Sequence, residues 1–553
     1  MQKKHLLLLS TLLISLSSCG IFNSTSTSGD TVTHTDSDEN NSTISQSSTS
    51  LDDKDPGSGE IDIYCINDFH GRVMKQTDEY AGGISRLSTY LNNKKASNPD
   101  GTIFLNAGDL WQDTYDSGQN RGELLTKASV EIGFEAMALG NHEFDWGVET
   151  IKHNKAIAES SENATQFTFL GCNIYNYDNT TNKATTQASD IASPYKVIER
   201  GDIRIGIIGA IGENQITSIT SSNWTNLTFL NPVSIVKETS DYLRSEQDCD
   251  VIIYMLHANL KSSSYATLSA VSPNTNKPYV DAAFLGHSHA YETAYSNGVP
   301  WIQSKSHGVA VGHVKLSVSN GSVTCEEYTD YKNNGYQSAG VGSGADSIYA
   351  CSPDEKIETI INKYITYDFV SMKNEKIGKL TNYNYSSIGS DIGRIQAYAT
   401  SKYIDELRSY GADIPSIDIV LNNGNRDEVS LDSECSLSRE EIFNLTPFTN
   451  KTIVAKVLGQ DIINEAINYS NPYYLPGEAA LTINADEYYT VACIDYLLLH
   501  KNKYRAYDYF SSYSDSLYVV NDYPYEIVWD YFVKNKTFDM STMSNVCYTG
   551  LSK

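Results

Sequence analysis

The sequence predicts an exported α/β protein with two domains, the first built of layered β-sheets flanked by helices. The chain has 553 residues, which is more than one hydrophobic core usually serves. Apolar runs typical of buried strands alternate with amphipathic stretches typical of helices, and this alternation favours an α/β layered fold. Several of these runs end in histidine, asparagine or aspartate. Such endings are typical of ligand sites at the carboxyl edge of a sheet.

The N-terminus has the pattern of an export signal. A basic head is followed by the apolar run Leu6–Leu16, which is too short to span a bilayer. The sequence Leu16-Ser17-Ser18-Cys19 resembles a bacterial lipobox, which implies cleavage before Cys19 and lipidation of its thiol. The alternative is an ordinary signal peptide with an incidental cysteine. We expect a signal peptide at 1–18 and a lipidated, Ser/Thr-rich tether at 19–60.

Charge and cysteine content exclude several classes of partner. The formal net charge of -27 argues against a nucleic-acid polymer or an anionic membrane face, because phosphate contacts need clustered Lys and Arg. A small phosphorylated ligand held by metals remains compatible with this charge. The eight cysteines after Cys19 show no paired spacing, so we interpret them as structural thiols rather than metal ligands.

Residues 61–335 form the first predicted domain. Apolar runs that begin at Ile61, Thr102, Ala136, Asp250 and Ala282 predict buried strands. Further elements are expected as helices at 83–91 and 123–130, a strand at 203–210, and loops over the polar stretch 165–192.

Five of the 11 histidines lie at the ends of the predicted strands, which scattered surface histidines would not do. They are His70, His142, His257, His287 and His289. We interpret His153, His307, His313 and His500 as ordinary residues.

The residues around these histidines predict a metal site. Asp68 and His70 are two positions apart, so in an extended segment both side chains point to one side. Asp109 follows a glycine, and its carboxylate can bridge two cations. Neutral ligands come from Asn141, His257, His287 and His289. A nitrogen and oxygen ligand set without thiolate suits Zn, Mn or Fe better than Ca, and we expect two divalent ions.

The C-terminal part predicts a second α/β domain. A linker helix is expected at 353–372, opened by Asp354 and Glu355 as the helix dipole favours. The domain follows at 373–553, with strands near 417–421 and 488–493 and a helix near 461–469.

The five strand-end motifs resemble, in this order, those of the calcineurin-like metallophosphoesterases. The stretch Gly140–Asp145 is similar to the 5′-nucleotidase and UDP-sugar hydrolase branch of that family. This resemblance implies a catalytic dyad of His142 and Asp145, and Glu143 is interpreted as an acceptor that orients a metal ligand. It also implies that one metal binds Asp68, His70, Asp109 and His289, and the other Asp109, Asn141, His257 and His287.

The C-terminal domain resembles the nucleotide-binding domain of the same branch. The resemblance implies that Phe448 stacks on the base, that Asn450 contacts it, and that Arg426 binds phosphate at the end of a turn one residue shorter than in the family. Tyr496 would replace the second stacking aromatic, since the family's Gly-Gly-Asp-Gly turn is missing here. The implied substrate-binding residues are Arg394, Asn422, Arg426, Phe448, Asn450 and Tyr496.

Together these features predict a lipid-anchored, extracytoplasmic phosphoesterase. The expected reaction converts a nucleoside 5′-monophosphate to nucleoside and phosphate by attack of a metal-bound hydroxide. Alternatives are a 2′,3′-cyclic nucleotide phosphodiesterase, a UDP-sugar or dinucleotide hydrolase, and a non-catalytic nucleotide-binding lipoprotein. The complete ligand set with a dyad argues against the last of these. The expected partners are nucleotides and, through the lipid, a membrane, while the sequence leaves the oligomeric state open.

Overall fold

The computed structural model describes most of the chain beyond residue 56. The predicted signal peptide, residues 19–56 of the predicted tether including Cys19, and His500 lie outside the described residues. The last two residues of the predicted tether, Gly59 and Glu60, belong to the first strand. The described ranges are 57–77, 79–160, 167–220, 223–224, 226–333, 339–422, 425–426, 428–468, 471–474, 483–498, 517–520 and 522–543.

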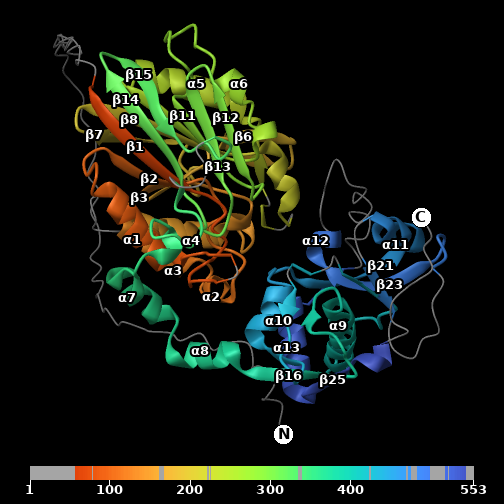
Figure 1. The fold of residues 1–553 in the computed structure, drawn as a ribbon. Helices are drawn as coiled ribbons and strands as arrows, with labels where there is room; N and C mark the ends of the chain where they lie inside the picture. Colours follow the sequence, from red (N-terminus) through yellow and green to blue (C-terminus); the bar gives the residue numbers. More distant parts are fainter. Residues whose placement is uncertain are drawn as a thin grey trace, which may run out of the picture. The chain divides into compact units, whose positions relative to one another are not determined.

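The first domain contains two six-stranded sheets (Figure 1). Their strand orders are β15-β14-β1-β2-β3-β4 and β12-β13-β11-β10-β8-β7. Strands β1 to β4 run parallel in the first sheet, and β8, β10, β11 and β13 run parallel in the second. The strands are β1 (Gly59–Ile66), β2 (Thr102–Asn106), β3 (Phe134–Ala138), β4 (Thr168–Leu170), β7 (Tyr195–Arg200), β8 (Ile203–Ile211), β10 (Val251–His257), β11 (Ala282–Leu285), β12 (Tyr291–Ser296), β13 (Val299–Ser304), β14 (Gly312–Ser319) and β15 (Ser322–Tyr328).

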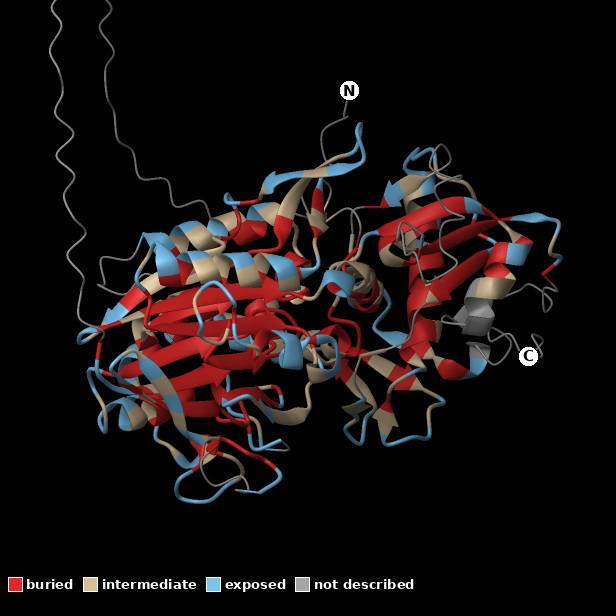
Figure 2. Cartoon of the chain, turned by 90° about the horizontal axis from the view of Figure 1, so that it is seen from above, coloured by how far each residue is buried: buried red, intermediate tan, exposed pale blue. Residues whose placement is uncertain are grey.

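The two sheets pack face to face between two layers of helices. Because side chains alternate along a strand, Ile61 and Ile63 of β1 join Ile205 and Ile207 of β8 in the core between the sheets. Tyr64 points to the opposite face and joins the core under the first helix layer. Figure 2 shows the central strands buried and the helices exposed on their outer side. One helix layer contains α1 (Gly83–Lys95), α3 (Glu123–Ile132) and α4 (Val148–Glu159), and the other contains α5 (Pro232–Ser245) and α6 (Tyr265–Leu268).

The polar stretch 165–192, expected to form loops, contains strands instead. Besides β4, it contains β5 (Ile174–Asp178) and β6 (Lys183–Gln187), which form a hairpin and pair through β5 with β9 (Leu227–Phe229). Most side chains of β6 are exposed, so this sheet does not need the apolar composition of a buried strand. The expectation was wrong because the polar composition of this stretch does not reveal that its backbone pairs with the distant strand β9.

The linker forms two helices rather than the single helix expected at 353–372. Asp354 caps α7 (Glu355–Tyr364), and Thr366 accepts a hydrogen bond from the backbone N–H of Phe369 to cap α8 (Tyr367–Asn374). Threonine is a favoured N-cap, and its extended conformation interrupts the helical path. The first cap was recognised in the sequence and the second was not.

The C-terminal domain contains a five-stranded sheet in the order β22-β18-β23-β21-β24. Val420 and Val454 face α9 (Ile392–Ser409) and α13 (Pro524–Asn535), while Ile419 and Ile453 face the core that includes Ile462. The sheet therefore has helices on both faces, as predicted for an α/β domain. Its strands are β18 (Ile419–Asn422), β21 (Thr452–Leu458), β22 (Asn471–Tyr474), β23 (Tyr488–Ile494) and β24 (Tyr518–Val520). The remaining elements include α10 (Arg439–Leu445), α11 (Gly459–Asn468), α12 (Asp495–Leu498), and the small sheet of β16 (Lys376–Thr381), β20 (Ser436–Ser438) and β25 (Thr537–Asp539).

Among the described residues, no helix is long and apolar enough to cross a bilayer.

Cys65, Cys172 and Cys249 are buried free thiols, which agrees with their interpretation as structural residues.

Candidate metal centre

The predicted metal ligands converge at the carboxyl ends of five parallel strands. Three of these strands come from the first sheet and two from the second. The loop after β1 carries Asp68 and His70, the loop after β2 carries Asp109, the loop after β3 carries Asn141, β10 ends in His257, and the loop after β11 carries His287 and His289.

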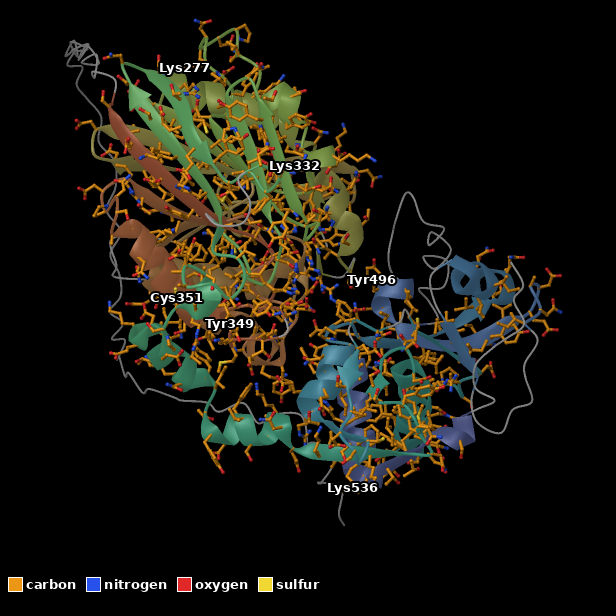
Figure 3. All side chains as sticks on the ribbon, viewed as in Figure 1. Lys277, Lys332, Tyr349, Cys351, Tyr496 and Lys536 are labelled. Carbon is orange, nitrogen blue, oxygen red and sulfur yellow. The ribbon has the colours of Figure 1, made fainter. Side chains whose placement is uncertain are left out.

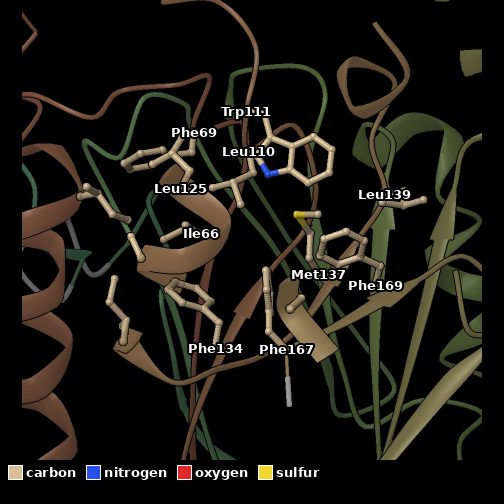
Figure 4. Close-up of a cluster of buried hydrophobic side chains, with 14 of the residues drawn as sticks. Ile66, Phe69, Leu110, Trp111, Leu125, Phe134, Met137, Leu139, Phe167 and Phe169 are labelled. Atoms are coloured by element: carbon tan, nitrogen blue, oxygen red, sulfur yellow. The ribbon is translucent and has the colours of Figure 1, made fainter. Parts of the chain in front are cut away.

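Apolar side chains anchor these loops in the core. Phe69 lies between Asp68 and His70 in sequence and is fully buried, as are Leu110 and Leu139 in the loops after β2 and β3. Figure 4 shows Phe69, Leu110 and Leu139 in one hydrophobic cluster. Each loop thus alternates an apolar anchor with a polar side chain directed away from the core, which limits the freedom of the ligands.

One group of candidate ligands consists of Asp68, His70 and His289, whose ligand atoms lie within 4.8 Å of one another. The Nε2 atoms of His70 and His289 are 2.8 Å apart. The Nε2 atom of His289 lies 3.6 Å from Oδ1 of Asp68. These atoms face a common point, as ligands of one ion do.

A second group consists of Asp109, His257 and His287. Oδ2 of Asp109 lies 3.1 Å from Nε2 of His257 and 3.9 Å from Nε2 of His70, so this oxygen lies between the two groups. Oδ1 of Asn141 lies 3.2 Å from Nε2 of His257 and 3.1 Å from Nδ1 of His287. Asp109 therefore lies between the two groups, and Asn141 lies beside the histidines of the second.

Carbonyl groups orient two of the imidazole rings. Nδ1 of His257 lies 2.8 Å from the carbonyl oxygen of Ala107, and Nδ1 of His70 lies 3.2 Å from that of Gln112. A ring that donates its Nδ1–H to a carbonyl keeps the Nε2 lone pair for a metal. Both rings therefore present Nε2 to the centre.

The ligand loops have a backbone conformation that the sequence does not reveal. Asp68, His70, Asp109 and His289 have φ between 48° and 55°, in the left-handed region. Such residues cost about 1–3 kcal/mol each and cluster at functional sites. Gly108 has φ of 99°, and a Cβ there would lie 2.5 Å from Nδ1 of His257, so only glycine fits.

Glu143 holds the loops after β2 and β3 together. Its fully buried carboxylate accepts hydrogen bonds from the backbone N–H groups of Asp109, Leu110 and Gly140, at 2.9, 2.8 and 2.8 Å. Asp109 and Asn141 are therefore fixed relative to each other by a side chain that lies behind them.

The donor atoms fit divalent cations chemically. Burial and the charge of Asp109 raise the pKa of Asp68 above its ordinary value, because two carboxylates close together in a buried place repel each other when both are ionised. Burial lowers the pKa of His287 and of His289 to about 4, so both rings are neutral, the form that binds metals. Cations held by the two groups would stabilise both carboxylates, and the nitrogen and oxygen donor set suits Zn or Mn.

His142 and Asp145 form the predicted dyad. Nδ1 of His142 lies 2.7 Å from Oδ2 of Asp145, and the backbone N–H of His142 donates to Oδ1 of Asp109. Burial by itself lowers the pKa of His142, but the charges of Asp145 and Asp109 raise it to about 10. The two carboxylates therefore favour the protonated form of this ring.

A cavity of about 250 Å³ adjoins this dyad and contains predicted substrate-binding residues. Phe448 and Arg426 line it together with His142 and His287. Tyr496, labelled in Figure 3, contributes to the same lining from α12. We refer to it below as the base cavity.

Asn450 lines the base cavity, and its amide nitrogen already has two acceptors. It donates to Oγ1 of Thr220 at 2.7 Å and to Oδ1 of Asp495 at 3.0 Å. The neighbouring Thr449 donates to the backbone carbonyl oxygen of Asp145 at 3.1 Å. The loop that carries Phe448 is therefore hydrogen-bonded to the loop that carries the dyad.

Asn422 and Arg394 are not in the base cavity. Asn422 hydrogen-bonds Gln396 and lines a smaller pocket of about 40 Å³ that shares Phe448 with the base cavity. Arg394 lies on α9 and pairs with Asp391 at 3.5 Å, and among the described residues it lines neither pocket.

His307, interpreted from the sequence as ordinary, lies against the centre. Its ring is 5.8 Å from those of both His70 and His289, and its backbone N–H donates to the carbonyl oxygen of Asp68 at 2.7 Å. Arg72, which the sequence did not single out, lies beside it. No strand-end motif marks either residue, so only the folded chain reveals their position.

Comparison with known proteins agrees with this geometry. Residues 61–291 match the Calcineurin-like phosphoesterase family. All seven candidate ligands and the dyad lie within the matched segment. The chain contains a calcineurin-like phosphoesterase domain.

Relatives of the phosphoesterase domain include a 5′-nucleotidase of Bos taurus, which is 28% identical over 241 residues that cover 42% of this chain and 38% of that protein. A cell wall protein of Listeria monocytogenes is 25% identical over 458 residues, which cover 74% of this chain and 56% of that protein. The chain thus spans about two fifths to just over half of these relatives.

A solved structure extends the likeness beyond the phosphoesterase domain. A putative 5′-nucleotidase from Staphylococcus aureus aligns over 88% of this chain and 99% of its own, with a TM-score of 0.63 and 15% identity. The predicted fold class, a phosphoesterase domain followed by a C-terminal α/β domain, is confirmed by this shared fold.

Proposed function

We propose that this protein is an extracytoplasmic phosphoesterase that uses two divalent metal ions to convert nucleoside 5′-monophosphates to nucleoside and phosphate. The observation that carries the proposal is the joining of two ligand groups through Asp109, directly beside the hydrogen-bonded pair of His142 and Asp145 and a cavity lined by Phe448.

One set of residues binds the phosphate, and another set binds the base. Two cations, when bound, would activate a water and neutralise phosphoryl oxygens. His142 donates a hydrogen bond from Nε2 to the phosphoryl group, while Asp145 holds its Nδ1. Arg426 offers guanidinium donors to the phosphate from the wall of the base cavity.

The base is held by aromatic contact in the base cavity. Phe448 supplies one face, and Tyr496 supplies a second aromatic ring in the same lining. Stacking of this kind tolerates different bases, because every base has a π-face. The bovine relative, a 5′-nucleotidase, supports a nucleotide as the substrate class.

A panel of phosphate-release assays tests the proposal. The full chain is stripped with EDTA and reloaded with Mn or Zn, and nucleoside 5′-monophosphates, 2′,3′-cyclic nucleotides, UDP-sugars and dinucleotides are compared. We expect metal-dependent release that is fastest for 5′-monophosphates. Equal rates with and without metal, or no release from any nucleotide, would contradict it.

We also propose that Cys19 carries lipid and anchors the protein at the membrane. The lipobox-like sequence at 16–19 supports the anchor, and the cell wall relative supports an extracytoplasmic location. Membrane fractionation of the unaltered protein and of Cys19→Ala tests it. An unaltered protein found entirely in the soluble fraction would reject the anchor.

A further inference from the structure

The loop after β2 carries a buried carboxylate in an unfavourable backbone conformation. Asp113, which follows Asp109 in this loop, has φ of 129°, in the region that favours glycine. Its side chain is 3% exposed, and among the described residues its Oδ1 atom has no hydrogen-bond partner. A strained backbone and a buried charge are both costly, and strained residues cluster at functional sites. The contacts of Asp113 therefore indicate what it does.

Asp113 lies between two arginines, one from each domain. Its Oδ2 lies 3.6 Å from Nη2 of Arg72, and its Oδ1 lies 3.4 Å from Nε of Arg426. Arg72 is fixed on its own side, because Nη1 donates to the carbonyl oxygen of His70 at 3.4 Å and Nη2 lies 3.3 Å from Nε2 of His307. The side chain of Arg72 is 9% exposed and that of Arg426 is 30% exposed. The buried arginine thus holds the carboxylate, and the carboxylate holds the more exposed arginine.

Arg426 lies where the base cavity meets a second cleft. This distal cleft has a volume of about 680 Å³ and is lined by Arg72, Asp113 and Arg426 among other residues. Arg426 lines both spaces, whereas Asp113 lines the distal cleft and not the base cavity. The backbone N–H of Arg426 donates to the carbonyl oxygen of Leu445 at 2.8 Å, which fixes its main chain. Because Asp113 occupies Nε, the two Nη groups remain for a ligand, and together they fit two oxygens of a phosphate.

The same loop also contacts the segment that carries the aromatic ring of the base cavity. Nε2 of Gln112 donates to the carbonyl oxygen of Pro447 at 3.3 Å, and Pro447 directly precedes Phe448. The carbonyl oxygen of Gln112 lies 3.2 Å from Nδ1 of His70. The loop that begins with the metal ligand Asp109 is thus in contact with another candidate ligand and with the C-terminal domain.

We propose that Asp113 is a positioning residue, which directs the guanidinium of Arg426 toward the phosphate at the metal centre. The carboxylate sets the orientation, and the Nη groups make the contact with phosphate. The inference rests on the proposed function, and it adds a residue that is neither a metal ligand, nor part of the dyad, nor among the substrate-binding residues predicted from the sequence. A loop of the phosphoesterase domain thereby orients the phosphate-binding arginine of the C-terminal domain.

Calorimetric binding to the metal-loaded full chain tests the proposal without requiring turnover. The probes are an adenosine 5′-phosphonate that resists hydrolysis and adenosine itself, which lacks the anionic group. Arg426→Gln should weaken the phosphonate about tenfold or more, because hydrogen bonds to a charged group are lost. Asp113→Asn keeps the size of the side chain but removes its charge, and should weaken the phosphonate about three- to tenfold. Adenosine should change less than about twofold in both variants, since it makes no phosphate contact.

A double variant and a matched control separate positioning from a structural role. Because Asp113 acts through Arg426, Asp113→Asn combined with Arg426→Gln should bind the phosphonate within about twofold of Arg426→Gln alone. Asp116→Asn is the control, since Asp116 also lines the distal cleft but pairs with Lys373 at 2.7 Å. It should leave both probes within about twofold of the unaltered protein. The calorimetric stoichiometry distinguishes a partly unfolded variant from one that binds more weakly.

Four results would overturn the positioning role. Tighter or unchanged phosphonate binding by Asp113→Asn would mean that the carboxylate competes with phosphate or has no influence on it. Equal weakening of phosphonate and adenosine would make Asp113 a structural residue. An effect that persists in full without Arg426, or that Asp116→Asn reproduces, would show that Asp113 does not act through that arginine.

The outcomes also distinguish this inference from the proposed function. If the unaltered protein binds the phosphonate no more tightly than adenosine, the phosphate site itself is rejected, and both proposals fail together. If the phosphonate binds tightly and depends on Asp113 and Arg426 as expected, but no nucleotide releases phosphate, only the catalytic function is rejected.

Discussion

Replacing Glu143 by Gln isolates the side chain that joins the loops of Asp109 and Asn141. In the unaltered protein Oε2 accepts from the N–H groups of Asp109 and Gly140, and Oε1 accepts from that of Leu110. A glutamine can place its amide oxygen where Oε2 lies, facing Asp109 and Gly140. Its NH₂ group then takes the place of Oε1 and faces the N–H of Leu110. One hydrogen bond is lost, and two donors oppose each other in a fully buried place.

The expected cost follows from these contacts. A buried donor left without an acceptor costs about 1–3 kcal/mol, and hydrogen bonds to a charged acceptor are worth about 1.5–3 kcal/mol against about 1 for a neutral one. One lost bond and two weakened bonds together give roughly 3–5 kcal/mol. At about 2 °C per kcal/mol for a large domain, Tm should fall by roughly 6–10 °C.

The assay is thermal unfolding of the unaltered protein, Glu143→Gln and Glu149→Gln, each with and without added Mn, together with the bound metal content. Glu149 is a matched control because its side chain is 87% exposed on α4. Glu143→Gln should also bind less metal, since Asp109 and Asn141 lose their common support. A Tm within about 1 °C of the unaltered protein, with full metal content, would refute the reasoning.

Three other changes test the metal centre and the base cavity, and a fourth tests the stability of the fold. Asp109→Asn should remove metal and turnover together, because its carboxylate lies between both ligand groups; full metal occupancy would reject the bridging position. His142→Ala should lower kcat by about 10²–10⁴ with metal content unchanged, as for loss of a group acting in the transition state, and unchanged kcat would reject that role. Phe448→Ala should raise KM for a nucleoside monophosphate about tenfold while leaving phenyl phosphate unaffected, since only the nucleotide loses a stacking contact; equal effects on both substrates would make Phe448 a core residue. Burial raises the pKa of Asp62, but hydrogen bonds from His313 and Asn98 bring it below its ordinary value. Asp62 therefore stabilises the fold above about pH 4, and that contribution is lost as pH falls further, so urea midpoints of the unaltered protein and Asp62→Asn should converge toward pH 3.

The sequence alone was sufficient to predict the structural features that depend only on neighbouring residues. Apolar runs predicted the strands that carry the ligands, and the polar residues at or just beyond the strand ends, such as Asp68, Asp109 and His257, are the ones that the folded chain brings together. A buried strand and a polar side chain at its end are both encoded within about ten residues. Capping by Asp354 was equally visible, whereas the second cap at Thr366 was overlooked.

Tertiary structure decided which residues without a local motif belong to the centre. The backbone N–H of His287 donates to Asp68 across 219 positions of sequence, and the two residues come from different sheets. Neither that pairing, nor the left-handed backbone of the ligands, nor the position of Arg72 and His307 beside them follows from nearby residues. They follow from the packing of two sheets whose carboxyl edges meet. The sequence of one segment does not reveal which distant segments will pack against it.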